Sequence, residues 1–144
     1  MSLPAAFWDS SALIPLCISQ PQTIAAQSLY AKYRIVVWWA TDVEIVSGLT
    51  RLQRMGGITH KQFLLSKPFL QNLVCEWNAV HESAGIASSA CSLLETHPLR
   101  AADALQLAAA LEACEHKPRG HVFVTGDQRL ADAARHIGFS VELV

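Results

Sequence analysis

Short apolar runs alternate along the chain with longer segments in which apolar residues recur at helical spacing. The apolar runs predict strands at residues 5–9, 35–39, 74–77, 121–125 and 140–143. The longer segments predict helices at residues 11–16, 23–33, 41–55, 82–96, 99–114 and 127–137. A further helical stretch begins at residue 59 and is expected to be interrupted at Pro68. Strands separated by helices in this way are typical of βαβ units.

The order of these elements predicts an α/β fold, a three-layer α/β/α domain with a mostly parallel central sheet. Parallel strands need crossover connections, and these place helices on both faces of the sheet. The chain has 144 residues and shows no internal repeat, linker or low-complexity tract. We therefore expect a single domain over residues 1–144.

Composition narrows the class of protein. Hydrophobic residues make up 51% of the chain and charged residues 16%, which is typical of a globular domain and not of a disordered one. Apolar runs fall short of the roughly 20 residues of a membrane span, and the first residues lack the basic segment of a signal peptide. The four cysteines form no CxxC pair, which argues against a thiolate metal site and fits a reducing compartment. We expect a cytoplasmic protein without a membrane partner.

Four of the twelve acids occupy unusual positions. Asp9 directly follows the first predicted strand, Glu44 begins the helix after the second, and Asp127 follows the strand at 121–125. Asp103 lies within LRAADALQLAAAL, a helix that is apolar on nearly every side, where an ionised carboxylate needs compensation. Ligands bind beyond the carboxyl ends of parallel strands. We therefore expect the four acids to converge at one edge of the sheet.

Local explanations exist for the first two of these acids. Asp9 would cap the helix that follows it, as Ser10 would equally well. Thr41 and Glu44 have the spacing of a capping box, in which the glutamate side chain only reaches back to a backbone N–H group. Taken singly, each acid is therefore compatible with a purely structural role.

The other two acids have local explanations as well, because Asp127 would cap a helix and Asp103 would pair with Arg100 one turn earlier. Together, however, the four would repel one another. Two unit charges about 5 Å apart repel by roughly 3 kcal/mol at an effective dielectric constant near 20. Such a cluster must take up protons or bind a cation. Oxygen ligands without His or Cys select a hard ion, Mg²⁺ or Mn²⁺.

Four segments carry these acids: FWDSSAL, ATDVEIVSGLTRL, LRAADALQLAAAL and VFVTGDQRLADAARHIGF. Their order and spacing resemble those of PIN-domain ribonucleases, above all the small VapC-like toxins of bacterial and archaeal toxin–antitoxin pairs. The acids of that family map onto Asp9, Glu44, Asp103 and Asp127, and none is missing. The resemblance spans nearly the whole chain and is thinnest at residues 59–80.

The resemblance implies a metal-dependent endoribonuclease. Asp9, Asp103 and Asp127 would hold one or two Mg²⁺ ions, or Mn²⁺, directly or through water. Glu44 would join them or orient a metal-bound water that attacks the phosphorus in line, leaving 5′-phosphate and 3′-hydroxyl ends. Further contacts to these ligands or to the substrate phosphate are expected from Ser10, Thr125 and Arg100.

The resemblance also implies three partners: an RNA substrate, a cognate antitoxin lying across the active-site groove, and a second copy of the chain in a homodimer. The net charge is −1, but without the four site acids 8 acids remain against 11 basic residues, an excess of +3. Basic residues that could form a rim for RNA are Arg34, Arg51, Arg54, Lys61 and Lys67. Apolar residues available for protein interfaces are Phe63, Leu64, Leu65, Phe69 and Leu70, whereas Trp38 and Trp39 are expected in the core.

Other functions are less compatible with the sequence. The alternative that stays open is a PIN-fold module that binds RNA or acts as a scaffold without cleaving. A phosphotransferase of the haloacid-dehalogenase type needs a second Asp two residues after the first, where this chain has Ser11. A receiver domain needs an acid pair and a late Lys that PAAF and SVELV do not supply. Histidine-based ribonuclease chemistry is disfavoured because the six histidines show no paired spacing.

Overall fold

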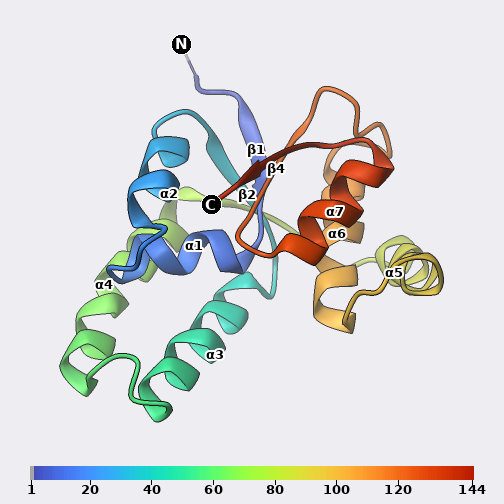
Figure 1. Cartoon of the computed structure of the whole chain (residues 1–144). Helices are drawn as coiled ribbons and strands as arrows, with labels where there is room; N and C mark the ends of the chain where they lie inside the picture. Colours follow the sequence, from blue (N-terminus) through green and yellow to red (C-terminus); the bar gives the residue numbers. More distant parts are fainter. Residues whose placement is uncertain (1) are drawn as a thin grey trace.

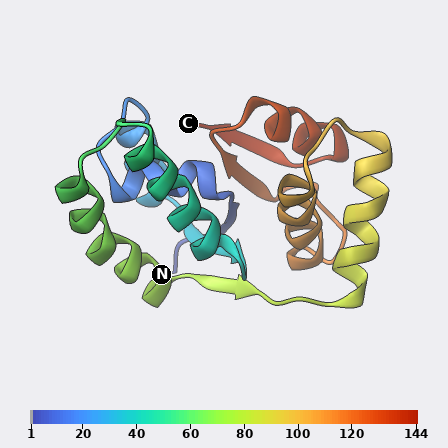
Figure 2. The ribbon, with the colours of Figure 1, turned by 90° about the horizontal axis from the view of Figure 1, so that it is seen from below.

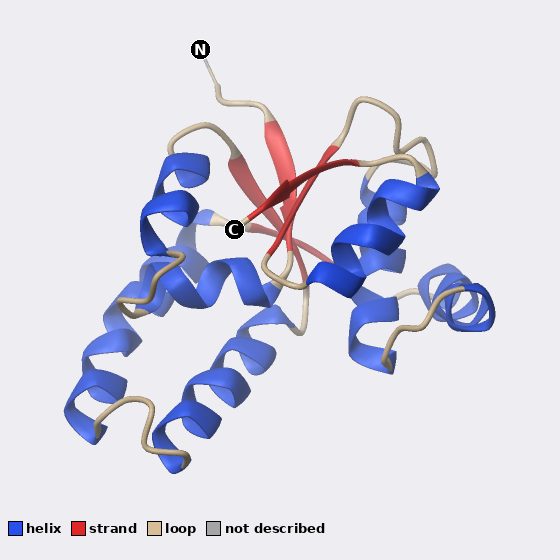
Figure 3. Ribbon diagram, in the orientation of Figure 1, coloured by secondary structure: helices blue, strands red, loops and turns tan. Residues whose placement is uncertain are grey.

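The computed structural model describes residues 2–144 and contains a five-stranded sheet in which every strand pair is parallel (Figures 1 and 3). The strands are β1 (Ala5–Trp8), β2 (Arg34–Trp38), β3 (Asn78–Val80), β4 (Val122–Thr125) and β5 (Ser140–Leu143). Their order across the sheet is β3-β2-β1-β4-β5. The strand order therefore reverses between β1 and β4, which is the position where open parallel sheets bind ligands.

Helices cover both faces of this sheet. They are α1 (Ser10–Cys17), α2 (Thr23–Tyr30), α3 (Thr41–Arg54), α4 (His60–Glu76), α5 (Ala84–Thr96), α6 (Ala101–Ala113) and α7 (Gln128–Ile137). Figure 2 shows α1 to α4 on one side and α5 to α7 on the other. This arrangement confirms the predicted three-layer α/β/α fold.

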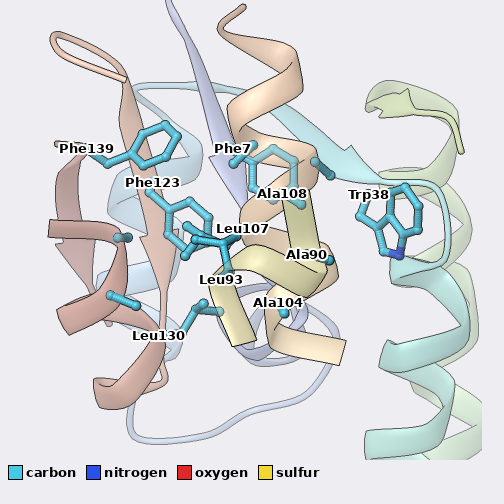
Figure 4. Close-up of a cluster of buried hydrophobic side chains, with 14 of the residues drawn as sticks. Phe7, Trp38, Ala90, Leu93, Ala104, Leu107, Ala108, Phe123, Leu130 and Phe139 are labelled. Carbon is cyan, nitrogen blue, oxygen red and sulfur yellow. The ribbon is translucent and has the colours of Figure 1, made fainter. Parts of the chain in front are cut away.

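Alternate residues of the strands contribute to two hydrophobic cores, one on each face. Phe7 of β1 and Phe123 of β4 stack with ring centroids 5.5 Å apart, and Phe139 packs 5.7 Å from Phe123 (Figure 4). These rings belong to the core beneath α5, α6 and α7. Trp8 and Val124, the next residues along the two strands, belong to the core on the opposite face. Both faces of the sheet are thus buried, as is usual for an all-parallel sheet.

The close packing of helix α6 explains why its sequence is so rich in alanine. The helix contacts α5, α7 and β2, so it has apolar neighbours on several sides. Ala104, Leu107 and Ala108 are completely buried in these contacts (Figure 4). Small side chains let a helix approach its neighbours closely at the packing density of a protein interior. Asp103 lies in the first turn of this helix, so the close packing of α6 determines which groups surround it.

Two predictions for the middle of the chain are wrong. Helix α4 is not interrupted at Pro68 but continues to residue 76. Residues 74–77 therefore form no strand, and the third strand begins only at Asn78. A proline inside a helix removes one backbone hydrogen bond and costs about 3 kcal/mol or more. Here a capping box at Thr59 stabilises the start of α4, and the buried Leu73 anchors its final turns.

The two adjacent tryptophans have different environments, although the sequence predicts both in the core. Trp38, the last residue of β2, is buried at 5% exposure, whereas Trp39 is 44% exposed. Trp39 lies in the turn that follows β2, so it is outside the strand whose side chains fill the two cores. The prediction is therefore right for Trp38 and wrong for Trp39.

All four cysteines are free thiols. Cys17 and Cys114 are buried, while Cys75 and Cys91 are exposed. Burial raises the pKa of the Cys17 thiol to about 12. Across residues 2–144, every helix is too short or too polar to cross a membrane.

Candidate active site

Four acidic side chains line one cleft at the carboxyl edge of the sheet. Asp9 follows β1, and Asp127 follows β4, its neighbour in the sheet. Glu44 lies in the first turn of α3, directly after β2, and Asp103 lies in the first turn of α6. The cleft has a volume of about 830 Å³. The fold thus brings together acids that are up to 118 residues apart in the chain, from position 9 to position 127.

Hydroxyl groups surround the carboxylate of Asp9, which is only 4% exposed. Thr125 donates a hydrogen bond to its Oδ2 over 3.0 Å, Ser11 donates to the same oxygen, and the hydroxyl of Ser10 lies 3.4 Å from Oδ1. Although Asp9 occupies the N-cap position of α1, its side chain makes no capping hydrogen bond. Burial raises the pKa of Asp9, its hydrogen bonds oppose the rise, and the charge of Asp103 adds to it.

Glu44 is not part of a capping box. The N-cap residue of α3 is Ala40, and Thr41 is completely buried. The Glu44 carboxylate instead accepts a hydrogen bond from Gln106 Nε2 at 3.0 Å and lies 3.4 Å from the hydroxyl of Ser10. Burial raises the pKa of Glu44 to about 7, and the neighbouring carboxylates contribute to the rise. A glutamate held this way is half protonated near neutral pH.

Asp127 has the capping role that its position suggests, and it lines the cleft as well. Its Oδ1 accepts hydrogen bonds from the backbone N–H groups of Arg129 at 2.9 Å and Leu130 at 3.3 Å. Within residues 2–144 no hydrogen bond reaches its other oxygen, Oδ2. One oxygen therefore stabilises α7 while the second is free to bind a ligand.

Asp103 forms no ion pair with Arg100 among the described residues, although the backbone N–H of Arg100 lowers the pKa of its carboxyl. Burial raises the pKa of Asp103, and the charge of Asp127 raises it further. The charges of Arg100 and Arg129 act in the opposite direction. The negative charge of Asp103, at the start of an apolar helix, is thus partly compensated by these two arginines.

The three residues predicted to support the acids lie close to them. The Ser10 hydroxyl sits between Asp9 and Glu44, 3.4 Å from an oxygen of each. Thr125 is completely buried, and its hydroxyl accepts the backbone N–H of Asp127 over 3.0 Å while donating to Asp9. Arg100 lines the cleft from the N-cap position of α6.

Sequence reasoning missed three residues of the cleft and its surroundings, among them Ser11, whose hydroxyl donates to the Asp9 carboxylate. Gln106 bonds Glu44 from within α6, and Arg129 lines the cleft from the first turn of α7. The signal for Gln106 was its polarity in an otherwise apolar helix. It also follows Asp103 by three residues and therefore lies on nearly the same face of that helix. Arg129 carried no signal of its own, because a single arginine in a first turn is ordinary helix surface.

The predicted basic rim is only partly found at the cleft. Of its five members, Arg51 lines the cleft. Arg34 is the first residue of β2 and therefore lies at the opposite, amino edge of the sheet, where its Nε donates to the Leu3 carbonyl over 2.8 Å. The basic side chains at the cleft are consequently Arg51, Arg100 and Arg129.

The acids do not form a closed metal cage. In the part of the chain that the structure describes, no three His, Cys, Asp or Glu side chains are close enough to hold an ion between them. Magnesium, however, is usually bound through one or two carboxylates and keeps several waters. A cleft whose candidate metal ligands are all carboxylates, with raised pKa values at Asp9, Glu44 and Asp103, fits a hydrated hard cation of this kind.

The raised pKa of Glu44 predicts how stability without divalent ions depends on pH. Between its ordinary pKa of 4.5 and the folded value of about 7, the folded chain holds a proton that the unfolded chain has released. Stability therefore falls as pH rises through this window. After discounting for solvent screening, we expect a loss of the order of 1–2 kcal/mol between about pH 5 and about pH 8. Urea unfolding in EDTA at the two pH values measures this loss of stability. The Glu44→Gln variant should show a smaller loss. An equal loss in that variant would mean that Glu44 is not the group responsible.

Comparison with solved structures shows that known proteins share the fold of this chain. A chain from a toxin–antitoxin complex of Klebsiella pneumoniae is 21% identical with a TM-score of 0.60, and the match covers 88% of this chain and 91% of that one. A chain from the crystal structure of FitAcB of Neisseria gonorrhoeae is 15% identical with a TM-score of 0.64, covering 94% of this chain and 95% of that one.

Sequence comparison gives the family. No curated protein sequence matches the chain. The family model of the PIN domain matches residues 6–136, a segment that contains all four acids of the cleft. The match covers far more than half of the 144 residues and confirms the resemblance seen in the four motifs. The chain belongs to the PIN domain family.

Proposed function

We propose that this protein is a metal-dependent endoribonuclease and the toxin of a type II toxin–antitoxin pair, acting in the cytoplasm. The observation that carries the proposal is the single cleft in which acids from four separate segments meet at the strand-order reversal. A purely structural role would leave each acid satisfied by its own local backbone, whereas Glu44 accepts a hydrogen bond from Gln106 and Asp9 accepts one from Thr125, both of which are distant in the sequence.

The proposal assigns one role to the three aspartates and another to Glu44. Asp9, Asp103 and Asp127 would hold Mg²⁺, or Mn²⁺, directly or through water. When bound, such an ion supplies Lewis-acid catalysis and lowers the pKa of water. Glu44, with a pKa of about 7, joins these ligands or orients the attacking water and accepts its proton. Ser10 and Thr125 keep the carboxylates in place through their hydroxyl groups.

The surroundings of the cleft are compatible with a polyanionic substrate, which in this proposal is RNA. Arg51, Arg100 and Arg129 reach the cleft from three different elements, and guanidinium groups bind phosphate oxygens in a bidentate manner. They are placed to hold phosphates next to the scissile one. Outside the four acids the chain has an excess of three positive charges, enough for a modest attraction to a polyanion.

An antitoxin and a second copy of the chain are the proposed protein partners. The solved structures similar to this chain include a toxin–antitoxin complex. Helix α4 also exposes large apolar side chains that a monomer would not need on its surface: Leu64 is 47% exposed, Leu65 58% and Phe69 56%. Exposed apolar surface of this kind is typical of protein interfaces.

The direct test is cleavage of structured and single-stranded RNA by the purified protein, freed of any antitoxin. We expect cleavage with Mg²⁺ or Mn²⁺, none after EDTA, and recovery when the ion is restored. Expression of the chain alone in a bacterial host should arrest growth, and Asp9→Asn should relieve the arrest. Asp132→Asn is the matched control, since Asp132 is exposed and paired with Arg135 outside the cleft. Cleavage that persists in EDTA would refute the metal mechanism.

A second function is favoured by one observation, the lack of a closed three-ligand metal cage among residues 2–144. The chain would then be a PIN-fold module that binds RNA or acts as a scaffold without cutting. RNA binding by gel shift, with no product under any divalent ion, would assign it to that class.

A further inference from the structure

One polar side chain interrupts the apolar sequence of the buried helix α6. Gln106 is completely buried, among the alanines and leucines of that helix. Its amide nitrogen donates to Glu44 Oε1 over 3.0 Å and lies 3.4 Å from the hydroxyl of Thr41. Its carbonyl oxygen is buried without a hydrogen-bond partner among the described residues. Burying an amide that is only half bonded is unfavourable, and an apolar residue of the same size would fill the space without that cost.

The hydrogen bond from Gln106 fixes one end of a chain of polar groups that leads from the core to the cleft. Glu44 is held at both carboxylate oxygens, by Gln106 at Oε1 and by the Ser10 hydroxyl, 3.4 Å away, at Oε2. The same hydroxyl lies 3.4 Å from Asp9 Oδ1. The orientation of the Glu44 carboxylate relative to Asp9 therefore depends on the amide behind it.

The chemistry of the amide suits this position. A lysine or arginine in its place would neutralise Glu44 and repel an approaching cation. An amide donates a hydrogen bond and leaves the carboxylate its negative charge. In addition, Gln106 follows Asp103 by three residues, so nearly the same face of one helix supplies one acid of the cleft and restrains another.

We infer that Gln106 is a positioning residue, which acts through Glu44 and holds its carboxylate in the orientation that catalysis requires. This inference rests on the proposed function, because it requires that Glu44 takes part in cleavage. It goes beyond that function by assigning a role to a buried residue that does not line the cleft.

The test compares Gln106→Met with Leu107→Met. Methionine nearly matches glutamine in length and shape but has no amide, and Leu107 is an equally buried neighbour on the same helix. We expect Gln106→Met to lower kcat about 10-fold and to leave KM for RNA and the Tm near the wild-type values. Leu107→Met should leave kcat unchanged. Unchanged kcat in Gln106→Met would overturn the inference.

Coupling to Glu44 is tested by a double-mutant cycle and by a readout other than activity. In a Glu44→Gln background, Gln106→Met should cause no further loss of the single-turnover cleavage rate or of Mn²⁺ affinity measured by titration calorimetry. Additive losses would mean that Gln106 acts by another route and would overturn the inference.

A crystal structure of Gln106→Met should show the Glu44 carboxylate displaced or disordered, and a carboxylate that keeps its place would also overturn the inference. If the wild-type protein cleaves no RNA, the proposed function fails, but this crystallographic comparison still decides whether Gln106 positions Glu44.

Discussion

Replacing Asp103 by Asn is expected to lower kcat/KM for RNA at least about 10²- to 10³-fold, because it removes one charge from the acids that we propose to hold the cation during hydrolysis of the phosphodiester. Asn keeps the size and one oxygen of the side chain, so helix α6 and its contacts should be unaffected. The measurement is single-turnover cleavage in saturating Mg²⁺, since saturation separates a weakened ion affinity from a lost catalytic contribution.

The stability of the same variant gives an independent check. Asp103 has a raised pKa because it is partly buried and close to Asp127, so its charge is unfavourable in the folded protein without a cation. The metal-free Asp103→Asn protein should therefore unfold at the same temperature as the wild type or a higher one. Asp132→Asn, outside the cleft, should leave activity unchanged. Full activity in Asp103→Asn would exclude this acid from the catalytic group.

Protons and divalent cations are expected to compete for the cleft. A ligand with a pKa of about 7, such as Glu44, must lose its proton before it can bind an ion. For one such group the apparent Kd for Mn²⁺ should rise about 30-fold from about pH 8 to about pH 5.5. Titration calorimetry at the two pH values measures the ratio, and buffers of different ionisation enthalpy report the released proton.

The matched variant for this experiment is Glu44→Gln, which has no proton to lose at position 44. It should bind Mn²⁺ more weakly at pH 8 and lose less affinity on acidification than the wild type does. The raised pKa values of Asp9 and Asp103 leave some pH dependence in that variant. An affinity for Mn²⁺ that does not change with pH in the wild-type protein would show that the acids of the cleft are not its ligands.

The position of the acids was predictable because it follows from a general property of parallel sheets. Asp9 and Asp127 come directly after apolar strands, and the carboxyl ends of parallel strands share one edge. The pattern alone also placed Asp103 in the apolar helix whose burial raises its pKa. Such inferences use local pattern and topology, which the sequence carries directly.

Errors arose where tertiary contacts override a local rule. Pro68 marks a helix break by its own chemistry, yet α4 continues through it because contacts on either side hold the helix. Thr41 and Glu44 have capping-box spacing, but Thr41 is buried and the glutamate turns toward Gln106. A partner 62 residues away in sequence is invisible to any rule based on spacing. Trp39 shows the same limit, since exposure depends on whether another element covers it.

The placement of β4 beside β1 has a consequence during synthesis. A ribosome that has made the first hundred residues has already produced Asp9 and Glu44, but Thr125 and Asp127 are missing and the central strand has an open edge. For the nuclease proposed above, the cleft would therefore be complete only once the last quarter of the chain is translated and β4 pairs with β1.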